Sequence, residues 1–316
     1  MRLAILDLGS NTTKLLVVES QVGEELIAIH QKSLSARMNL VNSSSETLEI
    51  SRESLADVLA AFSSLLEEAK DVGSDEIICV GTEALRRASN AGALIEEIKQ
   101  EGVTLRILSG EEEAKYVSLG LSTDPKFDSS RDFIGFDLGG GSIEILINRV
   151  SEKLKFHSLP LGTVRLTNRF FGTLNHAPSS NELNELRDFA AQLFEGVISE
   201  EYRHGFALAG IGGAMVFARK IMEDKNNVEI TESSEVSYDS LSALLEELIS
   251  MDLDARISRF PQLPRNRADI LPAGIAVILE LMGILNAQNL YHSLSNIRFG
   301  VAREFFDFQA DASKRT

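Results

Sequence analysis

The sequence contains an internal repeat, and this repeat limits the folds that the chain can adopt. Residues 6–17 read LDLGSNTTKLLV and residues 136–147 read FDLGGGSIEILI, so the two segments align without gaps at a spacing of 130 residues. Each segment predicts a β-hairpin, in which a strand ends in Asp-x-Gly and a turn with a hydroxyl side chain leads into a second apolar strand. Chance similarity between two hairpins is the alternative. The repeat favours two related half-molecules that face each other across a cleft.

The rest of the chain mixes predicted strands with predicted helices. Apolar, β-rich runs predict strands at 2–8, 14–20, 26–34, 76–81, 103–108, 133–137, 143–149, 154–159, 206–209 and 290–294. Apolar residues at helical spacing predict helices at 51–72, 91–100, 111–121, 180–202, 213–223, 239–250 and 268–285. Residues 122–132 carry Pro, Ser, Asp and Lys and are typical of a linker. Strands and helices on both sides of this linker indicate an α/β architecture.

The charge balance excludes some classes of partner. The chain has 47 acidic and 31 basic residues, which gives a net charge of -16. Such an acidic protein repels duplex DNA and anionic membranes at long range, so neither is expected as a partner. A small anionic ligand remains compatible, because a few cationic side chains, backbone amides and a divalent cation can reverse the field locally.

The sequence predicts a cytoplasmic protein without a membrane segment. The apolar run at 3–6 is broken by Asp7 and is too short for a signal peptide. The longest apolar stretch, 270–285, contains Pro272 and Glu280 and falls short of the roughly 20 apolar residues that a membrane span needs. The single cysteine, Cys79, can form neither an internal disulfide nor a Cys-based zinc site. It lies in an apolar run and is expected in the core.

The two hairpins carry the residue types of a phosphate clamp. Their glycines allow positive φ and keep side chains away from a ligand, and successive backbone amides can form an anion-binding nest. Hydroxyl and amide side chains in the turns add donors for phosphate oxygens. An aspartate at each strand end can hold Mg²⁺, usually through water. The residues concerned are Asp7, Gly9, Ser10, Asn11 and Thr12 in the first hairpin and Asp137, Gly139, Gly140, Gly141 and Ser142 in the second.

A third glycine turn, Gly210-Ile211-Gly212-Gly213, follows the predicted strand at 206–209 and precedes a helix. A dinucleotide fingerprint would need glycine at 215, where the chain has Met215. The Walker phosphate-loop pattern is also absent from the sequence. The turn therefore serves either close helix–strand packing or a further phosphate contact.

Five charged side chains are candidates for catalysis and substrate binding. Glu111, Glu112 and Glu113 open a predicted helix, where acidic residues suit the helix dipole, but three in a row leave one that can orient and deprotonate a water. Glu144 lies two residues beyond Ser142, on the same face of its strand. Arg86 follows a predicted strand and can bind phosphate, although a surface arginine pair with Arg87 is the alternative. The five histidines show no metal-ligand spacing.

Taken together, these motifs resemble the exopolyphosphatase and guanosine pentaphosphate phosphohydrolase (Ppx/GppA) family, a branch of the actin–hexokinase–Hsp70 superfamily. The resemblance rests on residues 7–11, 82–90, 109–114, 137–142, 159–166, 210–213 and 267–274. It implies a duplicated α/β fold of the actin-like, ribonuclease H-like type, with two domains around a central cleft. The first domain is expected at 1–122 with the last helix at about 300–316, and the second at 123–299.

The resemblance also implies an activity and roles for single residues. The activity is Mg²⁺-dependent release of a terminal phosphate from inorganic polyphosphate, or of the γ-phosphate from pppGpp. By position in this sequence, Glu113 matches the base for the attacking water, Glu144 a second catalytic carboxylate and Arg86 a substrate-contacting arginine. Asp137 matches a metal and water ligand, with Asp7 as its counterpart in the first repeat. The phosphate loops match Gly9, Ser10, Asn11, Gly139, Gly140, Gly141 and Ser142, and a third loop matches Gly212 and Gly213.

Two departures from the family pattern leave alternatives open. Thr12 stands for a serine and keeps the hydroxyl, whereas Ile143 stands for a threonine and removes one. The chain also matches the short form, without the C-terminal helical extension of long members, so processive action on long polyphosphate is not expected. The alternatives are an ATP-using kinase or ATPase of the same superfamily and a non-catalytic sensor of polyphosphate or guanosine tetraphosphate. A homodimer is compatible with the sequence.

Overall fold

The computed structural model describes residues 1–20, 25–42, 47–127, 131–172, 176–224, 230 and 232–313. Contacts between residues divide the chain into two units. Unit 1 comprises Met1–Pro125 and Ser295–Thr316, and unit 2 comprises Lys126–Leu294. The last helix therefore belongs to the same unit as the N-terminal strands.

Unit 1 is built on a five-stranded sheet in the order β3-β2-β1-β6-β7. Its strands are β1 (Arg2–Leu8), β2 (Thr12–Glu19), β3 (Ile27–Ser35), β6 (Glu76–Gly81) and β7 (Leu105–Ile107), with a separate hairpin of β4 (Leu40–Asn42) and β5 (Leu48–Ile50). Its helices are α1 (Arg52–Asp71), α2 (Glu83–Arg87), α3 (Ala91–Gln100), α4 (Gly110–Leu121) and α12 (Ile297–Ser313). Strands β1, β2 and β3 are antiparallel, whereas β1, β6 and β7 are parallel.

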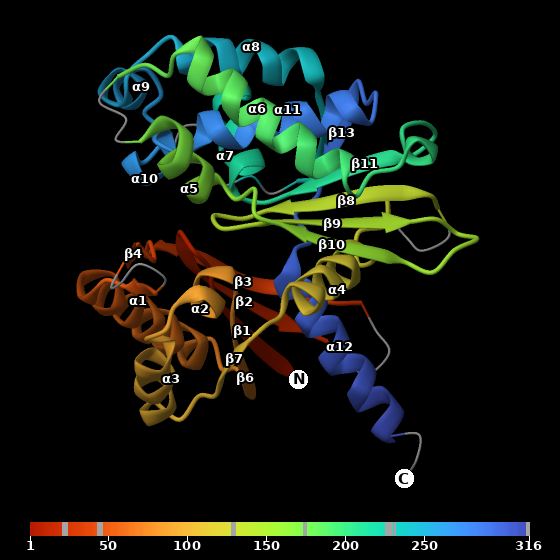
Figure 1. The fold of residues 1–316 in the computed structure, drawn as a ribbon. Coiled ribbons are helices and arrows are strands. Elements are labelled where there is room, and N and C mark those ends of the chain that lie inside the picture. The colour runs from red at the N-terminus through yellow and green to blue at the C-terminus, as the bar shows by residue number, and fades with distance from the viewer. Residues whose placement is uncertain are drawn as a thin grey trace. The chain divides into compact units, whose positions relative to one another are not determined.

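Alternation along β1 separates the two faces of the unit 1 sheet. Leu6 and Leu8 join the hydrophobic cluster that contains the buried side of α1. Leu3 and Ile5 point to the opposite face and are fully buried, because α12 packs against β1 there. In Figure 1, α1 and α3 lie on one side of this sheet and α4 and α12 on the other. The next residue in the alternation, Asp7, thus lies on the α4 and α12 side.

Two glycines allow α4 and α12 to pack closely. A Cβ added at Gly300 would overlap the carbonyl oxygen of Tyr116, and one at Gly120 would overlap that of Asn296. A side-chain hydrogen bond also links the two helices: Glu304 of α12 accepts from the Tyr116 hydroxyl of α4 at 2.5 Å. The C-terminal helix thereby fixes α4, the helix that carries Glu113 in its first turn.

Unit 2 is built on a six-stranded sheet in the order β10-β9-β8-β11-β13-β12. Its strands are β8 (Phe133–Leu138), β9 (Ile143–Asn148), β10 (Lys155–Leu159), β11 (Ala207–Ile211), β12 (Ser234–Ser237) and β13 (Asn289–His292). Its α-helices are α5 (Thr163–Leu166), α6 (Ser180–Glu195), α7 (Gly213–Met222), α8 (Tyr238–Ile249), α9 (Leu253–Arg259), α10 (Arg265–Ala268) and α11 (Leu271–Ile284). A π-helical turn spans Thr167–Phe171 and a 3-10 turn spans Glu200–Tyr202.

The apolar stretch at 270–285 forms the central helix of unit 2. Helix α11 is buried almost all round, because α5, α6, α7 and α8 pack against it. A helix that is apolar on every side is expected in such a position. Among the described residues, no helix is both long enough and apolar enough to cross a membrane.

The two sheets confirm that the fold is a duplicated α/β fold. Strands β8, β9, β10, β11 and β13 occupy the same places as β1, β2, β3, β6 and β7, and β12 is an addition at the edge of unit 2. The hairpins also share their register: Asp7 pairs with Lys14 in the first, and Asp137 pairs with Glu144 in the second. The repeat in the sequence therefore corresponds to a repeat in backbone geometry.

Some sequence-based element boundaries were wrong. The helix predicted at 180–202 ends at Glu195 and is followed by Gly196, after which the chain forms the short turn at Glu200–Tyr202. The helix predicted at 268–285 begins only at Leu271, with Pro272 in its first turn, where a missing N–H has no cost. The linker predicted at 122–132 lies partly outside the described residues, since 128–130 are not among them. Cys79 is buried in the unit 1 core with a free thiol, as expected.

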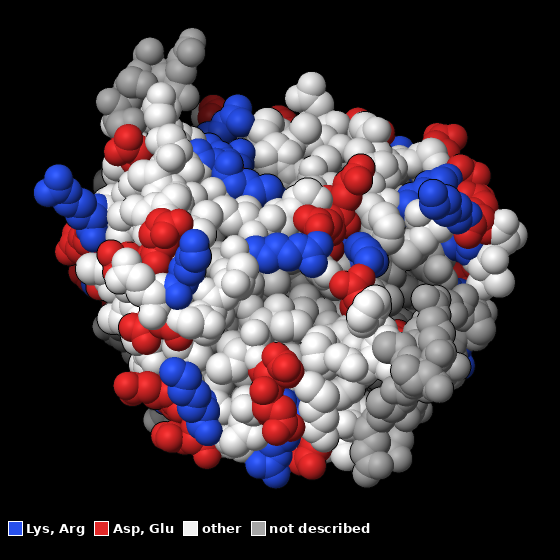
Figure 2. Space-filling view, turned by 90° about the horizontal axis from the view of Figure 1, so that it is seen from below, with Lys and Arg blue, Asp and Glu red and all other residues white. Residues whose placement is uncertain are grey.

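Figure 2 shows one face of the molecule, on which Lys and Arg side chains are interspersed with Asp and Glu. Among the described residues, exposed ion pairs include Arg106 with Glu112 and Lys115 with Glu304. Exposed pairs of this kind contribute at most about 1 kcal/mol each to stability.

Buried His292 predicts a loss of stability in acid. Its Nδ1 lies 3.1 Å from Nη1 of Arg219 and its side chain is 1% exposed. Burial, helped by the Arg219 charge, lowers the pKa of His292 to about 3. In the unfolded chain the histidine binds a proton near pH 6.5, whereas in the folded chain it stays neutral there. The stability that neutral His292 contributes is therefore fully present above pH 6.5 and is lost as the pH falls. We expect about 2 kcal/mol less unfolding free energy at pH 5 than at pH 7 from this residue.

Urea unfolding of the wild type and of His292→Asn at both pH values would measure this difference. Asparagine can accept from Arg219 without titrating, so the variant should lose about 2 kcal/mol of the pH dependence. Exposed His204→Asn is the matched control and should leave the dependence unchanged. An unaltered pH dependence in His292→Asn would contradict the assignment.

Candidate functional site

The predicted site residues of unit 1 follow the carboxyl ends of its parallel strands. Asp7 lies near the end of β1, Arg86 lies in α2 after β6, and Glu113 lies in α4 after β7. Parallel neighbouring strands place these ends at one edge of the sheet. The edge therefore gathers three residue types that the sequence spreads over more than 100 positions.

The first loop, 9–12, is fixed by backbone hydrogen bonds. The Gly9 amide donates to the Thr12 carbonyl at 3.1 Å, and the Met38 amide donates to the Ser10 carbonyl at 2.9 Å. The side chains of Ser10, Asn11 and Thr12 are buried. The loop is thus held from both sides before any ligand binds.

Asp7 carries an acceptor that lacks a partner. Its side chain is 3% exposed, and Oδ2 lies 3.8 Å from Nζ of Lys14. Its Oδ1 is buried and has no hydrogen-bond partner among the described residues. A buried carboxylate oxygen without a donor is costly, so it suits a site where a cation or an ordered water binds.

The three glutamates at the start of α4 have different environments. Ser109 caps the helix, accepting from the Glu112 amide at 3.1 Å, and Glu112 accepts in turn from the Ser109 amide at 2.8 Å. The Ser109 amide and then Arg106 hold the pKa of Glu112 below its usual range. Glu111 is exposed, whereas Glu113 is 4% exposed. Only the third carboxylate is therefore buried within the fold.

Glu113 forms an ion pair with Arg86, residues that the sequence separates by 27 positions. Arg86 Nη1 also donates to the Leu108 carbonyl at 2.6 Å. The structure thus brings the predicted base and the predicted substrate arginine together. Arg87, the other arginine of this segment, is exposed and pairs with Glu83 at 3.2 Å.

In unit 2, the predicted carboxylates lie side by side across the sheet. Asp137 pairs directly with Glu144, and Glu144 pairs with Ser158 on β10. Ser158 Oγ donates to Glu144 Oε1 at 2.9 Å, and Glu144 is 4% exposed. The same row in unit 1 is Asp7, Lys14 and Ser33. Unit 2 therefore presents two carboxylates where unit 1 presents a carboxylate and an amine.

The triple-glycine loop is held by the segment that follows β10. The amides of Thr163 and Val164 donate to the carbonyls of Gly139 and Gly140 at 3.0 and 2.9 Å. A Cβ added at Gly162 would overlap the backbone of Gly140 and Gly141. Hydrogen bonds to its carbonyls therefore fix the loop in place. The role of Gly162 was missed from the sequence, although its segment belongs to the resemblance.

The third glycine turn lies against the second aspartate. Gly212 has a φ of 113°, and a Cβ there would lie 2.5 Å from the Leu138 carbonyl oxygen and 3.1 Å from Asp137 Oδ1. A Cβ at Gly213 would meet the Arg267 guanidinium at 2.6 Å. Close packing thus accounts for both glycines, and it also places the turn beside Asp137.

Ile143 lies away from these polar groups. Its side chain is fully buried in the hydrophobic core of unit 2, together with Leu138 and Leu161. Alternation along β9 places it on the face opposite Glu144. Ile143, which stands where the family has a threonine, therefore packs in the hydrophobic core on the face of β9 opposite Glu144.

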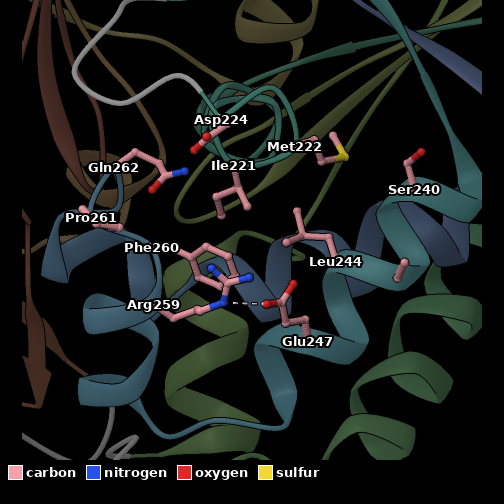
Figure 3. Close-up of a pocket in the computed structure, with 11 residues that line it drawn as sticks. Ile221, Met222, Asp224, Ser240, Leu244, Glu247, Arg259, Phe260, Pro261 and Gln262 are labelled. Carbon is pink, nitrogen blue, oxygen red and sulfur yellow. Dashed lines mark hydrogen bonds and ion pairs between the residues drawn. The ribbon is translucent and has the colours of Figure 1, made fainter.

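A cavity of about 430 Å³ lies elsewhere in unit 2, between α7, α8 and the chain after α9. Figure 3 shows Leu244, Phe260 and Ile221 around it, with Arg259 Nε paired to Glu247 Oε1 at 3.0 Å. None of the predicted site residues lines this cavity. The site residues therefore lie at the sheet edges and not in this cavity.

Comparisons with known proteins agree with these features. A model described as the Ppx/GppA phosphatase family matches residues 17–306. A guanosine-5'-triphosphate,3'-diphosphate pyrophosphatase from Aeromonas salmonicida is 27% identical over 308 residues, covering 94% of this chain and 58% of the relative. One from Photobacterium profundum is 24% identical, covering 95% and 58%. The chain thus spans less than two thirds of the length of these curated relatives.

Two solved structures share the fold. The Ppx/GppA family member from Aquifex aeolicus matches with a TM-score of 0.80 at 21% identity, covering 98% of each chain. A structure described as an exopolyphosphatase from Cytophaga hutchinsonii matches with a TM-score of 0.85 at 20% identity, also covering 98% of each chain. At these identities the likeness establishes the fold.

Proposed function

We propose, from the premise that this chain belongs to the Ppx/GppA phosphatase family, that it hydrolyses a terminal phosphoanhydride bond of pppGpp or of inorganic polyphosphate. The observation that carries the proposal is buried Glu113, paired with Arg86 at the sheet edge that bears the first Asp-Gly loop. A carboxylate, a guanidinium and loop amides at one edge are the groups that hydrolytic phosphoryl transfer needs. The names of the curated relatives and of the solved neighbour support these two substrate classes.

The reaction is an in-line attack of water on the terminal phosphorus. Glu113 accepts the proton of the attacking water, the bond from phosphorus to the bridging oxygen breaks, and the shortened polyanion leaves. Backbone amides of the glycine loops and the guanidinium of Arg86 stabilise the charge on the transferred group. Glu144 serves as the second carboxylate, and the bond from Ser158 keeps one of its oxygens in place.

In each unit, the carboxylates present fit Mg²⁺ held mainly through water. Among the described residues, no group of three or more His, Cys, Asp or Glu forms a ready-made metal cluster. Unit 1 instead offers the orphaned Oδ1 of Asp7, and unit 2 offers the cross-strand pair of Asp137 and Glu144. Such few oxygen ligands suit Mg²⁺ with several retained waters. A bound Mg²⁺ would neutralise phosphate charge.

The core position of Ile143 leaves no observation that favours a binding-only sensor.

We place the reaction in the cytoplasm, which the single, buried Cys79 thiol supports. A homodimer stays a prediction that sedimentation equilibrium would test.

A phosphate-release assay tests the proposed function. We expect Mg²⁺-dependent release of inorganic phosphate from pppGpp, from short polyphosphate or from both, and loss of release in EDTA. Long polyphosphate and ATP are measured side by side. Phosphate transfer from ATP to an acceptor, with ADP formed, would instead identify a kinase, and tight binding without turnover would identify a sensor.

A further inference from the structure

The Asn11 side chain can bind a phosphate in only one orientation. Its amide has an acceptor oxygen on one branch and two N–H donors on the other, and phosphate oxygens only accept. Asn11 belongs to the first loop and is 4% exposed, so it cannot reorient freely. Some neighbour must therefore determine which branch of the amide is directed toward a ligand.

Arg37 supplies that constraint. Its Nε donates to Asn11 Oδ1 at 2.6 Å. Guanidinium groups have no acceptor, so only the oxygen branch of the amide can face it. The Ala36 and Met38 amides on either side donate to the Asn11 and Ser10 carbonyls at 3.4 and 2.9 Å. Backbone and side chain thus hold Arg37 against the loop together.

Unit 2 repeats this arrangement. Arg165 lies in the segment after β10, as Arg37 lies in the segment after β3. Its Nε donates at 2.9 Å to the carbonyl of Gly141, which aligns with Asn11 in the repeat. Because glycine has no side chain, the bond goes to the backbone there. An arginine at this place in both halves indicates a common way of fixing the loop.

We infer that Arg37 is a positioning residue, which turns the amide donors of Asn11 toward a substrate phosphate. The inference rests on the proposed function, because it concerns the same phosphate loop. A bond to a charged donor sets the orientation more strongly than a neutral one. Arg37 acts on binding through Asn11, so its loss should raise KM more than it lowers kcat.

A double-mutant cycle tests this inference. We measure kcat and KM for phosphate release in the wild type, Arg37→Met, Asn11→Ala and the double variant. Arg37→Met should raise KM roughly tenfold, while in the Asn11→Ala background it should change KM by less than about twofold. Additive effects would overturn the inference. Arg303→Met removes an exposed arginine paired with Asp307 and should leave both constants unchanged.

Two further variants separate positioning from charge. Arg37→Gln keeps a neutral donor for Asn11, so its KM should lie between those of the wild type and Arg37→Met. If only Arg37→Lys lowered KM toward the wild-type value, residue 37 would contact the substrate through its charge, which would contradict the inference. If Arg37→Met does not fold, Asn11→Asp is used as the test variant instead. An aspartate at position 11 can still accept the bond from Arg37, but it lacks the two N–H donors of the amide. This variant should be at least as stable to urea as the wild type and should still raise KM roughly tenfold. If the wild type releases no phosphate from any substrate, the proposed function fails, and the inference fails with it.

Discussion

Glu113→Gln is expected to fold normally and to lose phosphate release by a factor of roughly 10² to 10⁴ in kcat. Glutamine keeps the size of the side chain and an oxygen that can accept from Arg86, so the contact between α2 and α4 can persist. It cannot take a proton from the attacking water. A malachite-green assay under saturating substrate would measure the loss, and thermal unfolding would show that the fold is retained.

Glu111→Gln is the matched control for this experiment. It makes the same change two residues earlier on the same helix, but its side chain is exposed. The control should keep kcat within about twofold of the wild type. Full activity in Glu113→Gln would remove Glu113 from the role of base.

Gly162→Ala should damage both stability and activity. The added methyl group would overlap the backbone of Gly140 and Gly141, which cannot move as the end of a flexible side chain could. We expect a loss of about 3 kcal/mol in unfolding free energy, typical of severe overpacking. Displacement of the triple-glycine loop by about 1 Å should also lower phosphate release roughly 100-fold. Urea unfolding and the phosphate assay would measure the two effects.

Gly283→Ala provides the comparison within the same unit. An added Cβ at Gly283 in α11 would meet nothing within 4 Å. Alanine in a helix interior is expected to stabilise by roughly 0.5 to 1 kcal/mol relative to glycine. If Gly162→Ala matched this control in stability and activity, the close packing of the loop would be unimportant.

The repeat and the hydrophobic periodicity were enough to predict most of the fold. Strand β6 and helix α3 have the predicted bounds, because their apolar patterns are strong and their ends are marked by turn residues. The sequence did not predict the short helices α2, α9 and α10 as separate elements. Helices of four to seven residues are stable only through tertiary packing, so local sequence carries little signal for them.

The candidate site was predictable in its chemistry but not in its contacts. The residue types in the Asp-Gly loops indicated phosphate binding, whereas the pairing of Glu113 with Arg86 depends on the order of β6 and β7 in the sheet. Arg37 gave no local signal at all. It reaches Asn11 because β3 pairs with β2 and leads the chain past the first loop.

The place of α12 in unit 1 has a consequence for biosynthesis. Helix α12 packs on α4 and on the strands that begin the chain, although residues 126–294 separate them. A ribosome therefore finishes the whole of unit 2 before it makes the helix that completes unit 1. Until then, the side of the unit 1 sheet that carries Leu3 and Ile5 lacks the helix that packs on it.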